Sequence, residues 1–156
     1  MKKAGEMKRT GAVRKIQVRE EACIGCHLCE FYCAAEHHPS KDLLKAFGPG
    51  RERPRGRVRV VEEGPVSFAL VCRHCDEPLC VFACVSGAME RDLETGKVIH
   101  DPERCVGCLS CILACANGTI LWDEKRGVVA KCDLCPGREV PACVAGCPNE
   151  ALILTE

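Results

Sequence analysis

The hydrophobic and polar positions of this chain predict short strands joined by loops. Residues 15–19 (KIQVR) alternate polar and apolar side chains, and residues 151–155 (ALILT) form a short, mainly apolar segment, so both are predicted as strands. Residues 28–35 follow a loop and are predicted to form a helix. No apolar stretch approaches the roughly 18 residues needed to span a bilayer, so no direct membrane span is expected.

Three further pairs of short segments are predicted as β-hairpins. Residues 58–61 precede 67–71, residues 88–92 precede 97–100, and residues 119–123 precede 127–131, each pair with turn residues between them. The first hairpin looks like an insertion, because it follows a turn-rich basic segment at 48–57. Short strands and single-turn helices alternating with loops favour an α+β fold rich in loops.

Composition shows that packed aromatic rings cannot supply the core. The chain has 156 residues, of which 4% are aromatic and 16 are cysteine. Its start is basic but has no apolar run behind it, so no export signal is expected and the protein is predicted to be cytoplasmic. In a reducing compartment this density of cysteine favours metal binding over disulfides.

The cysteines form four quartets. The first and third share the spacing C-x2-C-x2-C-x3-C, whereas the second widens the middle gap to four residues and the fourth to seven. The quartets are Cys23, Cys26, Cys29 and Cys33; Cys72, Cys75, Cys80 and Cys84; Cys105, Cys108, Cys111 and Cys115; and Cys132, Cys135, Cys143 and Cys147.

This spacing is typical of iron-sulfur ligation. Three thiolates at intervals of three residues let a tight loop wrap one face of a cuboidal cluster, and small residues such as Gly25 and Gly107 ease the bend. In two-cluster bacterial ferredoxins the last thiolate of each run binds the neighbouring cluster. Four quartets therefore predict four 4Fe-4S clusters held by exchanged ligands, although spacing alone does not say which quartets exchange them.

Zinc and disulfides are the competing interpretations of these cysteines. The fourth quartet, taken alone, could be a structural zinc site, and a zinc-stabilised interaction module is therefore the alternative function. A disulfide framework would need an oxidising compartment. The two tight ferredoxin-like runs favour clusters over both.

These motifs resemble the four-cluster ferredoxin subunits of the dimethyl-sulfoxide-reductase and formate-dehydrogenase type. That group includes electron-transfer partners of carbon monoxide dehydrogenases, hydrogenases and tungsten aldehyde oxidoreductases. The resemblance covers about residues 14–156. It rests on the segments CIGCHLC at 23–29, CRHCDEPLC at 72–80, CVGCLSC at 105–111, KCDLC at 131–135 and PACVAGCP at 141–148.

The resemblance implies two nested, two-cluster ferredoxin-like units. The outer unit would comprise residues 14–71 and 130–156, the inner unit residues 72–129, and a basic leader residues 1–13. Outer quartets would exchange ligands with each other, and inner quartets likewise, with sequential pairing as the rival. The implied ligand sets are Cys23, Cys26, Cys29 and Cys147; Cys132, Cys135, Cys143 and Cys33; Cys72, Cys75, Cys80 and Cys115; and Cys105, Cys108, Cys111 and Cys84.

The expected function is electron transfer without catalysis, since no catalytic triad, phosphate loop or open metal position is evident. By resemblance, the first partner is a large catalytic oxidoreductase subunit. The best candidate is a tungsten or molybdenum pterin aldehyde or formate oxidoreductase, followed by carbon monoxide dehydrogenase or hydrogenase. The second partner would be a ferredoxin, a flavoprotein or further copies of the chain. A free, diffusible polyferredoxin is the other alternative.

Three residues beside the cysteines are candidates for tuning cluster potentials. Lys131, Arg73 and His74 could raise the potential of a neighbouring cluster through positive charge or N–H donation. His27, His37 and His38 are expected at the surface or beside the ligands, and Trp122 is expected to pack beside a cluster.

The alternating arginines between residues 51 and 59 are predicted to be a solvated hairpin or a docking site for an acidic partner. Nucleic-acid binding is not expected, because 22 basic residues balance 22 acidic ones and no aromatic platform accompanies the arginines.

Overall fold

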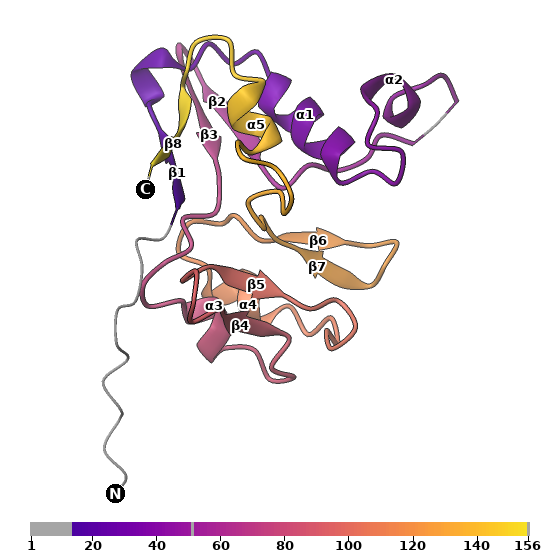
Figure 1. Cartoon of the computed structure of the whole chain (residues 1–156), viewed down its shortest axis with the longest axis vertical. Coiled ribbons are helices and arrows are strands. Elements are labelled where there is room, and N and C mark those ends of the chain that lie inside the picture. The colour runs from indigo at the N-terminus through magenta and orange to yellow at the C-terminus, as the bar shows by residue number, and fades with distance from the viewer. Residues whose placement is uncertain (1–13, 51, 156) are drawn as a thin grey trace, which may run out of the picture.

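The computed structural model describes residues 14–50 and 52–155. The predicted basic leader at 1–13 and Arg51 of the arginine series lie outside the described residues. Within these residues the strands form four two-stranded antiparallel sheets, joined by short helices and loops (Figure 1). This agrees with the loop-rich α+β fold that the sequence predicts.

One sheet joins the two ends of the described chain. Strand β1 (Lys15–Val18) pairs with β8 (Leu152–Thr155), so that Ile16 lies opposite Leu154. Ile16 and Leu152 are both buried. The sequence predicted both strands. It did not predict their pairing, which connects segments more than 130 residues apart.

The other three sheets are the predicted hairpins. Their bounds differ from the predicted ones by at most two residues. The hairpins are β2 (Arg59–Glu63) with β3 (Val66–Leu70), β4 (Met89–Arg91) with β5 (Val98–His100), and β6 (Leu121–Asp123) with β7 (Val128–Ala130).

The helices are short, and four of them carry cysteines. They are α1 (Leu28–Glu36), α3 (Leu79–Phe82), α4 (Ser110–Ala114) and α5 (Ala142–Ala145), with a 3-10 turn, η1, at Glu20–Ala22. Helix α2 (Leu43–Ala46) was not predicted; the Asp42 carboxylate caps it by accepting a hydrogen bond from the Lys45 N–H at 2.8 Å. Among the described residues, no helix is long and apolar enough to cross a membrane.

The core consists of two separate groups of buried side chains. The first buried cluster takes residues from segments 16–72 and 132–154, whereas the second takes residues only from 80–129. The first cluster lies among α1, α5 and β1–β3, which form the upper part of the molecule in Figure 1. The second lies among α3, α4 and β4–β7, which form the lower part. This division supports the nested organisation, which stays a prediction.

Candidate metal centres

The third cysteine of every quartet occupies the same place in a helix. Each is the second residue of its helix, and the fourth cysteine follows four residues later. The third cysteines are Cys29 in α1, Cys80 in α3, Cys111 in α4 and Cys143 in α5. Four segments with different spacings therefore adopt one local structure.

The loops before these helices contain a left-handed backbone. Gly25 and Gly107 have φ angles of 66° and 67°, which the sequence anticipated from their place in the cysteine runs. A Cβ on Gly25 would lie 2.6 Å from a carboxylate oxygen of Glu62, and one on Gly107 would lie 2.6 Å from the carbonyl oxygen of Gly127. The left-handed backbone favours glycine at both positions, and at Gly107 the backbone oxygen also leaves no space for a side chain.

The structure brings the last cysteine of one quartet beside the first three of another. Burial raises the pKa of Cys29 to about 12, and the charges of Cys147 and Cys26 contribute to this shift. Burial likewise raises the pKa of Cys80 to about 11, with contributions from Cys72, Cys115 and Cys75.

The other two groups of cysteines show the same proximity. Burial raises the pKa of Cys111, and the charges of Cys84 and Cys105 add to the effect. Burial also raises the pKa of Cys143, and the largest charge contribution comes from Cys33. These neighbours are those that the nested pairing predicts; ligation itself stays a prediction.

Two cavities are each lined by four cysteines. One is lined by Cys23, Cys26, Cys29 and Cys147. The other is lined by Cys72, Cys75, Cys80 and Cys115. All sixteen cysteines are free thiols. Four sulfurs around one cavity fit a cuboidal cluster held by four thiolates.

The fourth cysteines receive hydrogen bonds from the chain that follows them. Backbone N–H groups reach the Sγ atoms of Cys33 (3.1 Å), Cys84 (3.4 Å) and Cys147 (3.2 Å). Burial opposes ionisation of Cys84, but the hydrogen bond from the Met89 N–H and others more than offset it, so its pKa is lowered. Such donors stabilise thiolates, the form that binds iron.

The donor to Cys33 comes from the inserted segment, because it is the N–H of Arg57. The Arg57 guanidinium also contacts the Asp133 carboxylate at 2.6 Å. Arg55 donates to the carbonyl oxygen of Trp122 at 3.4 Å. The arginine series is therefore partly used inside the protein, which the sequence did not reveal.

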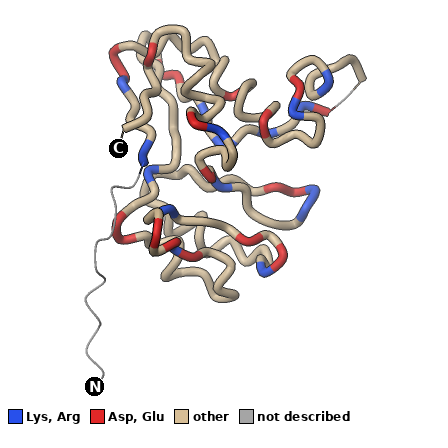
Figure 2. Tube along the Cα trace, in the orientation of Figure 1, with Lys and Arg blue, Asp and Glu red and all other residues tan. Residues whose placement is uncertain are grey.

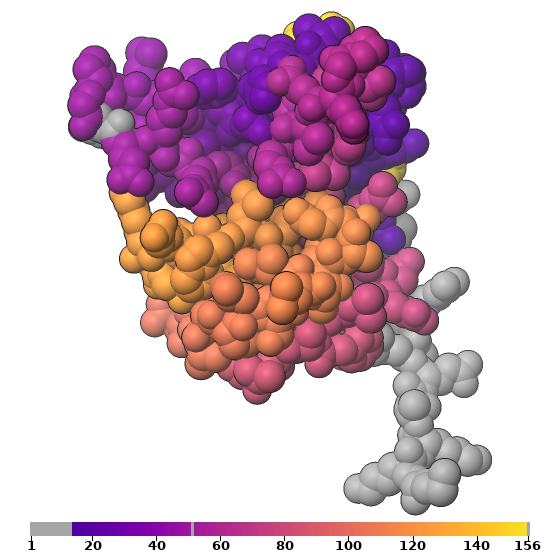
Figure 3. All heavy atoms as spheres, turned by 180° about the vertical axis from the view of Figure 1, so that it is seen from behind, coloured from indigo at the N-terminus to yellow at the C-terminus, as the bar shows by residue number. Residues whose placement is uncertain are grey.

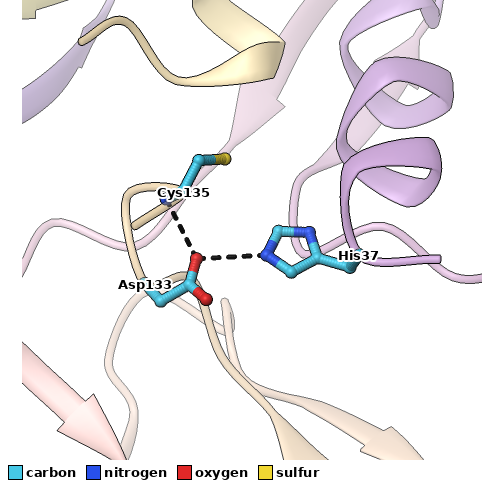
Figure 4. A group of neighbouring side chains, drawn as sticks. All are labelled: His37, Asp133 and Cys135. Atoms are coloured by element: carbon cyan, nitrogen blue, oxygen red, sulfur yellow. Dashed lines mark hydrogen bonds and ion pairs between the residues drawn. The ribbon is translucent and has the colours of Figure 1, made fainter. Parts of the chain in front are cut away.

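His37, Asp133 and Cys135 form a second feature that sequence reasoning missed (Figure 4). His37 Nε2 lies 3.1 Å from Asp133 Oδ1, which also accepts the Cys135 N–H at 3.0 Å. Burial opposes protonation of His37, but its hydrogen bond to Asp133 raises its pKa to about 9. The group links α1 to the fourth quartet, and no local signal joins residues 96 positions apart.

The three candidate tuning residues all line the cavity of Cys72, Cys75, Cys80 and Cys115. His74 is completely buried and Lys131 is 3% exposed, whereas Arg73 is exposed. The Lys131 Nζ atom donates to the carbonyl oxygens of Val98 at 2.6 Å and Cys132 at 3.0 Å.

Of the remaining candidates, His27 lines the cavity of Cys23, Cys26, Cys29 and Cys147, whereas His38 and Trp122 line neither cysteine cavity. The His27 ring bridges the carboxylates of Glu30 and Glu62, at 3.0 and 3.4 Å, on the protein surface. Trp122 packs against the second buried cluster of side chains, whereas its packing beside an iron-sulfur cluster stays a prediction. His38 contacts the Ser40 hydroxyl at 2.8 Å.

A hollow separates the inserted segment from the β6–β7 hairpin (Figure 3). Arg53, Arg55, Lys125 and Arg126 are among its lining residues. Glu52 bridges to Lys125 at 2.5 Å across it. Charges of both signs are mixed along the described chain (Figure 2), in keeping with the absence of a nucleic-acid signal in the sequence.

Comparison with known proteins gives consistent matches. Residues 66–156 match a family described as a 4Fe-4S dicluster domain. The chain is 35% identical over 150 residues to the electron transport protein HydN of Escherichia coli (strain K12), covering 86% of this chain and 83% of HydN. It is 38% identical over 131 residues to the NADH-dependent phenylglyoxylate dehydrogenase subunit beta of Aromatoleum evansii, covering 83% of this chain and 27% of that subunit.

Among solved structures, the fold is similar to a chain of the active site complex BamBC of benzoyl coenzyme A reductase as isolated. The TM-score is 0.50 and the identity 26%, and the match covers 92% of this chain and 76% of that one.

Proposed function

This chain belongs to the 4Fe-4S dicluster domain family, and we propose that it relays single electrons through four 4Fe-4S clusters. It is an iron-sulfur electron-transport protein of the kind that serves oxidoreductases. The observation that carries the proposal is the gathering of sixteen free thiols into four neighbourhoods, each with three cysteines of one quartet and the last cysteine of another.

The proposed number of four clusters is larger than the two that a dicluster domain holds. The family match begins at residue 66, so the first quartet lies before it. The first quartet nevertheless has the same helix position for Cys29 and the same left-handed Gly25 as the third quartet has for Cys111 and Gly107. Equal local structure supports equal ligation, and hence four clusters.

The arrangement of the cysteines favours clusters over zinc. Structural zinc usually takes two C-x2-C pairs separated by about 12 to 20 residues. Here each group of four combines three cysteines of one quartet with the last cysteine of another, which is the pattern of two-cluster ferredoxins. The zinc-stabilised module is therefore the weaker alternative.

The proposed path has two accessible ends. Cys26 and Cys108 are exposed, whereas Cys72 and Cys132 are buried. The charge of Cys72 contributes to the raised pKa of Cys132, after burial, so these two thiols are neighbours where the two ligand sets meet. Each cluster, when bound, would supply a site that takes up and gives back one electron. The chain would hold these sites in order and keep the middle of the path away from water.

The partners are proposed from the surface at one end. Helices α3 and α4 pack together and expose Phe82 (70%) and Leu113 (87%) close in sequence to cluster-binding cysteines. An apolar surface of this kind suits a lasting contact with another protein. We assign it to a large catalytic oxidoreductase subunit, first a tungsten or molybdenum pterin aldehyde or formate oxidoreductase, then carbon monoxide dehydrogenase or hydrogenase. The second redox protein would approach the end at Cys26.

Anaerobic purification tests the function directly. Four clusters predict brown protein with about 16 iron atoms per chain and reducible paramagnetic centres. Colourless protein with about four zinc ions would support the interaction module instead. The chain alone should turn over no substrate. Elution of the cluster-loaded chain alone from extracts of its host would support the diffusible carrier over the subunit.

A further inference from the structure

We propose that His74 donates a hydrogen bond from Nε2–H to the centre held by Cys72, Cys75, Cys80 and Cys115, and that this donor raises the reduction potential of that one centre. The inference rests on the proposed function. It starts from the orientation and burial of the imidazole, and it assigns a distinct role to one of the four centres.

The hydrogen bond at the other ring nitrogen fixes the tautomer of His74. Nδ1 lies 3.1 Å from the backbone N of Val98, which is a donor, so Nδ1 must accept. A ring nitrogen that accepts a hydrogen bond carries no proton, so the imidazole is neutral and its proton lies on Nε2.

The Nε2–H group has no acceptor within the described part of the chain. Nε2 is buried and makes no hydrogen bond there, and the whole side chain is 0% exposed. A buried donor without an acceptor is costly, and proteins rarely leave one. His74 lines the same cavity as four cysteines, and a bound cluster would bring thiolate and sulfide sulfurs, which accept hydrogen bonds.

Comparison of the four cysteine loops shows that His74 is exceptional at its position. The residue before the second cysteine is Gly25, His74, Gly107 or Leu134, and its φ is positive in every loop, at 66°, 44°, 67° and 61°. Of these four residues, only histidine has a side chain that can donate a hydrogen bond. All four loops share this left-handed backbone, so the feature that sets the second loop apart is the imidazole itself.

Donation from His74 would act on one centre only. Hydrogen bonds to cluster sulfurs stabilise the more negative, reduced state and so raise the potential. This centre lies next to the set that contains Cys132, because Cys72 is a neighbour of Cys132. With its higher reduction potential, the centre beside His74 would hold an electron more readily than the neighbouring centre that contains Cys132.

Two substitutions of His74 distinguish the effect of its Nε2–H donor from the effect of its packing. In His74→Asn the amide oxygen can still accept the Val98 N–H, but the donor at Nε2 is lost. In His74→Gln an amide N–H can take the place of Nε2–H. His38→Asn, on the surface after α1, is the control. The full chain is loaded and titrated anaerobically, with the potential of each centre followed by electron paramagnetic resonance.

We expect His74→Asn to move one of four potentials to a more negative value and to leave three unchanged. His74→Gln should move it back toward the wild-type value, and His38→Asn should shift none. Loaded His74→Asn protein with four unshifted potentials would overturn the inference.

A second measurement does not depend on the folding of any variant. Wild-type protein labelled with 15N-histidine should show coupling of one histidine nitrogen to a reduced centre, and absence of that coupling would also overturn the inference. Wild-type protein without iron would instead overturn the proposed function, and this inference with it.

Discussion

The Nζ atom of Lys131 lies 2.6 Å from the carbonyl oxygen of Val98, whose N–H is bound by His74. Val98 in β5 therefore contacts two buried polar side chains that line the same cavity. Lys131 is 3% exposed, and no carboxylate forms an ion pair with it in the part of the chain that the structure describes. A buried ammonium group without a counter-charge is costly. The sulfurs of Cys80 and Cys132 lie close to it, and both would be negative thiolates when they bind iron.

Lys131→Met should lower the potential of the centres nearest to residue 131. Methionine retains most of the side-chain volume but removes the positive charge that favours the reduced, more negative state. We expect a shift on the order of 60 mV, which corresponds to a tenfold change in a one-electron equilibrium. Redox titration of the loaded protein measures it. Lys125→Met, on the exposed β6–β7 turn, is the control and should cause no comparable shift; equal effects of the two variants would contradict the assignment.

Paired serine substitutions distinguish nested from sequential ligand exchange. Under nested exchange, Cys80→Ser and Cys115→Ser disturb the same centre, so each protein should lose the same spectral signal. If that centre is lost, iron should fall from about 16 to about 12 atoms per chain. Under sequential exchange, Cys115→Ser would instead affect the signal lost in Cys143→Ser. Iron analysis with electron paramagnetic resonance of the three proteins decides between the two.

Arg57→Ala should weaken the attachment of the inserted segment. The Arg57 guanidinium lies 2.6 Å from the Asp133 carboxylate, and both side chains are partly buried. Loss of a charged hydrogen bond of this kind should reduce the free energy of unfolding by about 1–2 kcal/mol. Anaerobic denaturant titration measures the change. Arg53→Ala removes an exposed arginine of the same segment and should change the unfolding free energy by less than about 0.5 kcal/mol.

Leu113→Glu should reduce binding of the catalytic partner without loss of iron. Leu113 is 87% exposed on α4, and burial of a leucine contributes about 1.5–3 kcal/mol. A loss of this size weakens binding at least about tenfold. Leu44→Glu changes a residue of similar exposure on α2 and is the control. Co-purification with the partner gives the result, and retention of the partner by Leu113→Glu at wild-type levels would exclude this surface.

Iron removal should unfold most of the chain. Both buried clusters contain cysteines, among them Cys29, Cys72 and Cys111, so the core is built partly from the proposed ligands. In metal-rich small domains much of the folding free energy comes from metal binding. Circular dichroism and protease resistance, measured after chelation under anaerobic conditions, report the change. Native spectra in iron-free protein would show that packing alone suffices.

The sequence predicted the local elements well because their signals are local. Alternation in residues 15–19 and the turn residues of the hairpins were enough to place the strands. The cysteine spacing identified the chemistry, since thiolates at intervals of three residues suit few sites other than a cluster. Helix α2 was missed because it is a single turn held mainly by the Asp42 cap.

The sequence by itself thus predicted which cysteines would bind clusters, and it determined where the short strands and the first helix lie. Only the tertiary structure decided which segments meet: β1 with β8, Arg57 with Asp133, and the Val98 peptide with both His74 and Lys131. The physical reason is that spacing along the chain fixes the geometry of one loop, whereas contacts between distant segments depend on how the whole chain buries its apolar residues and satisfies its buried polar groups.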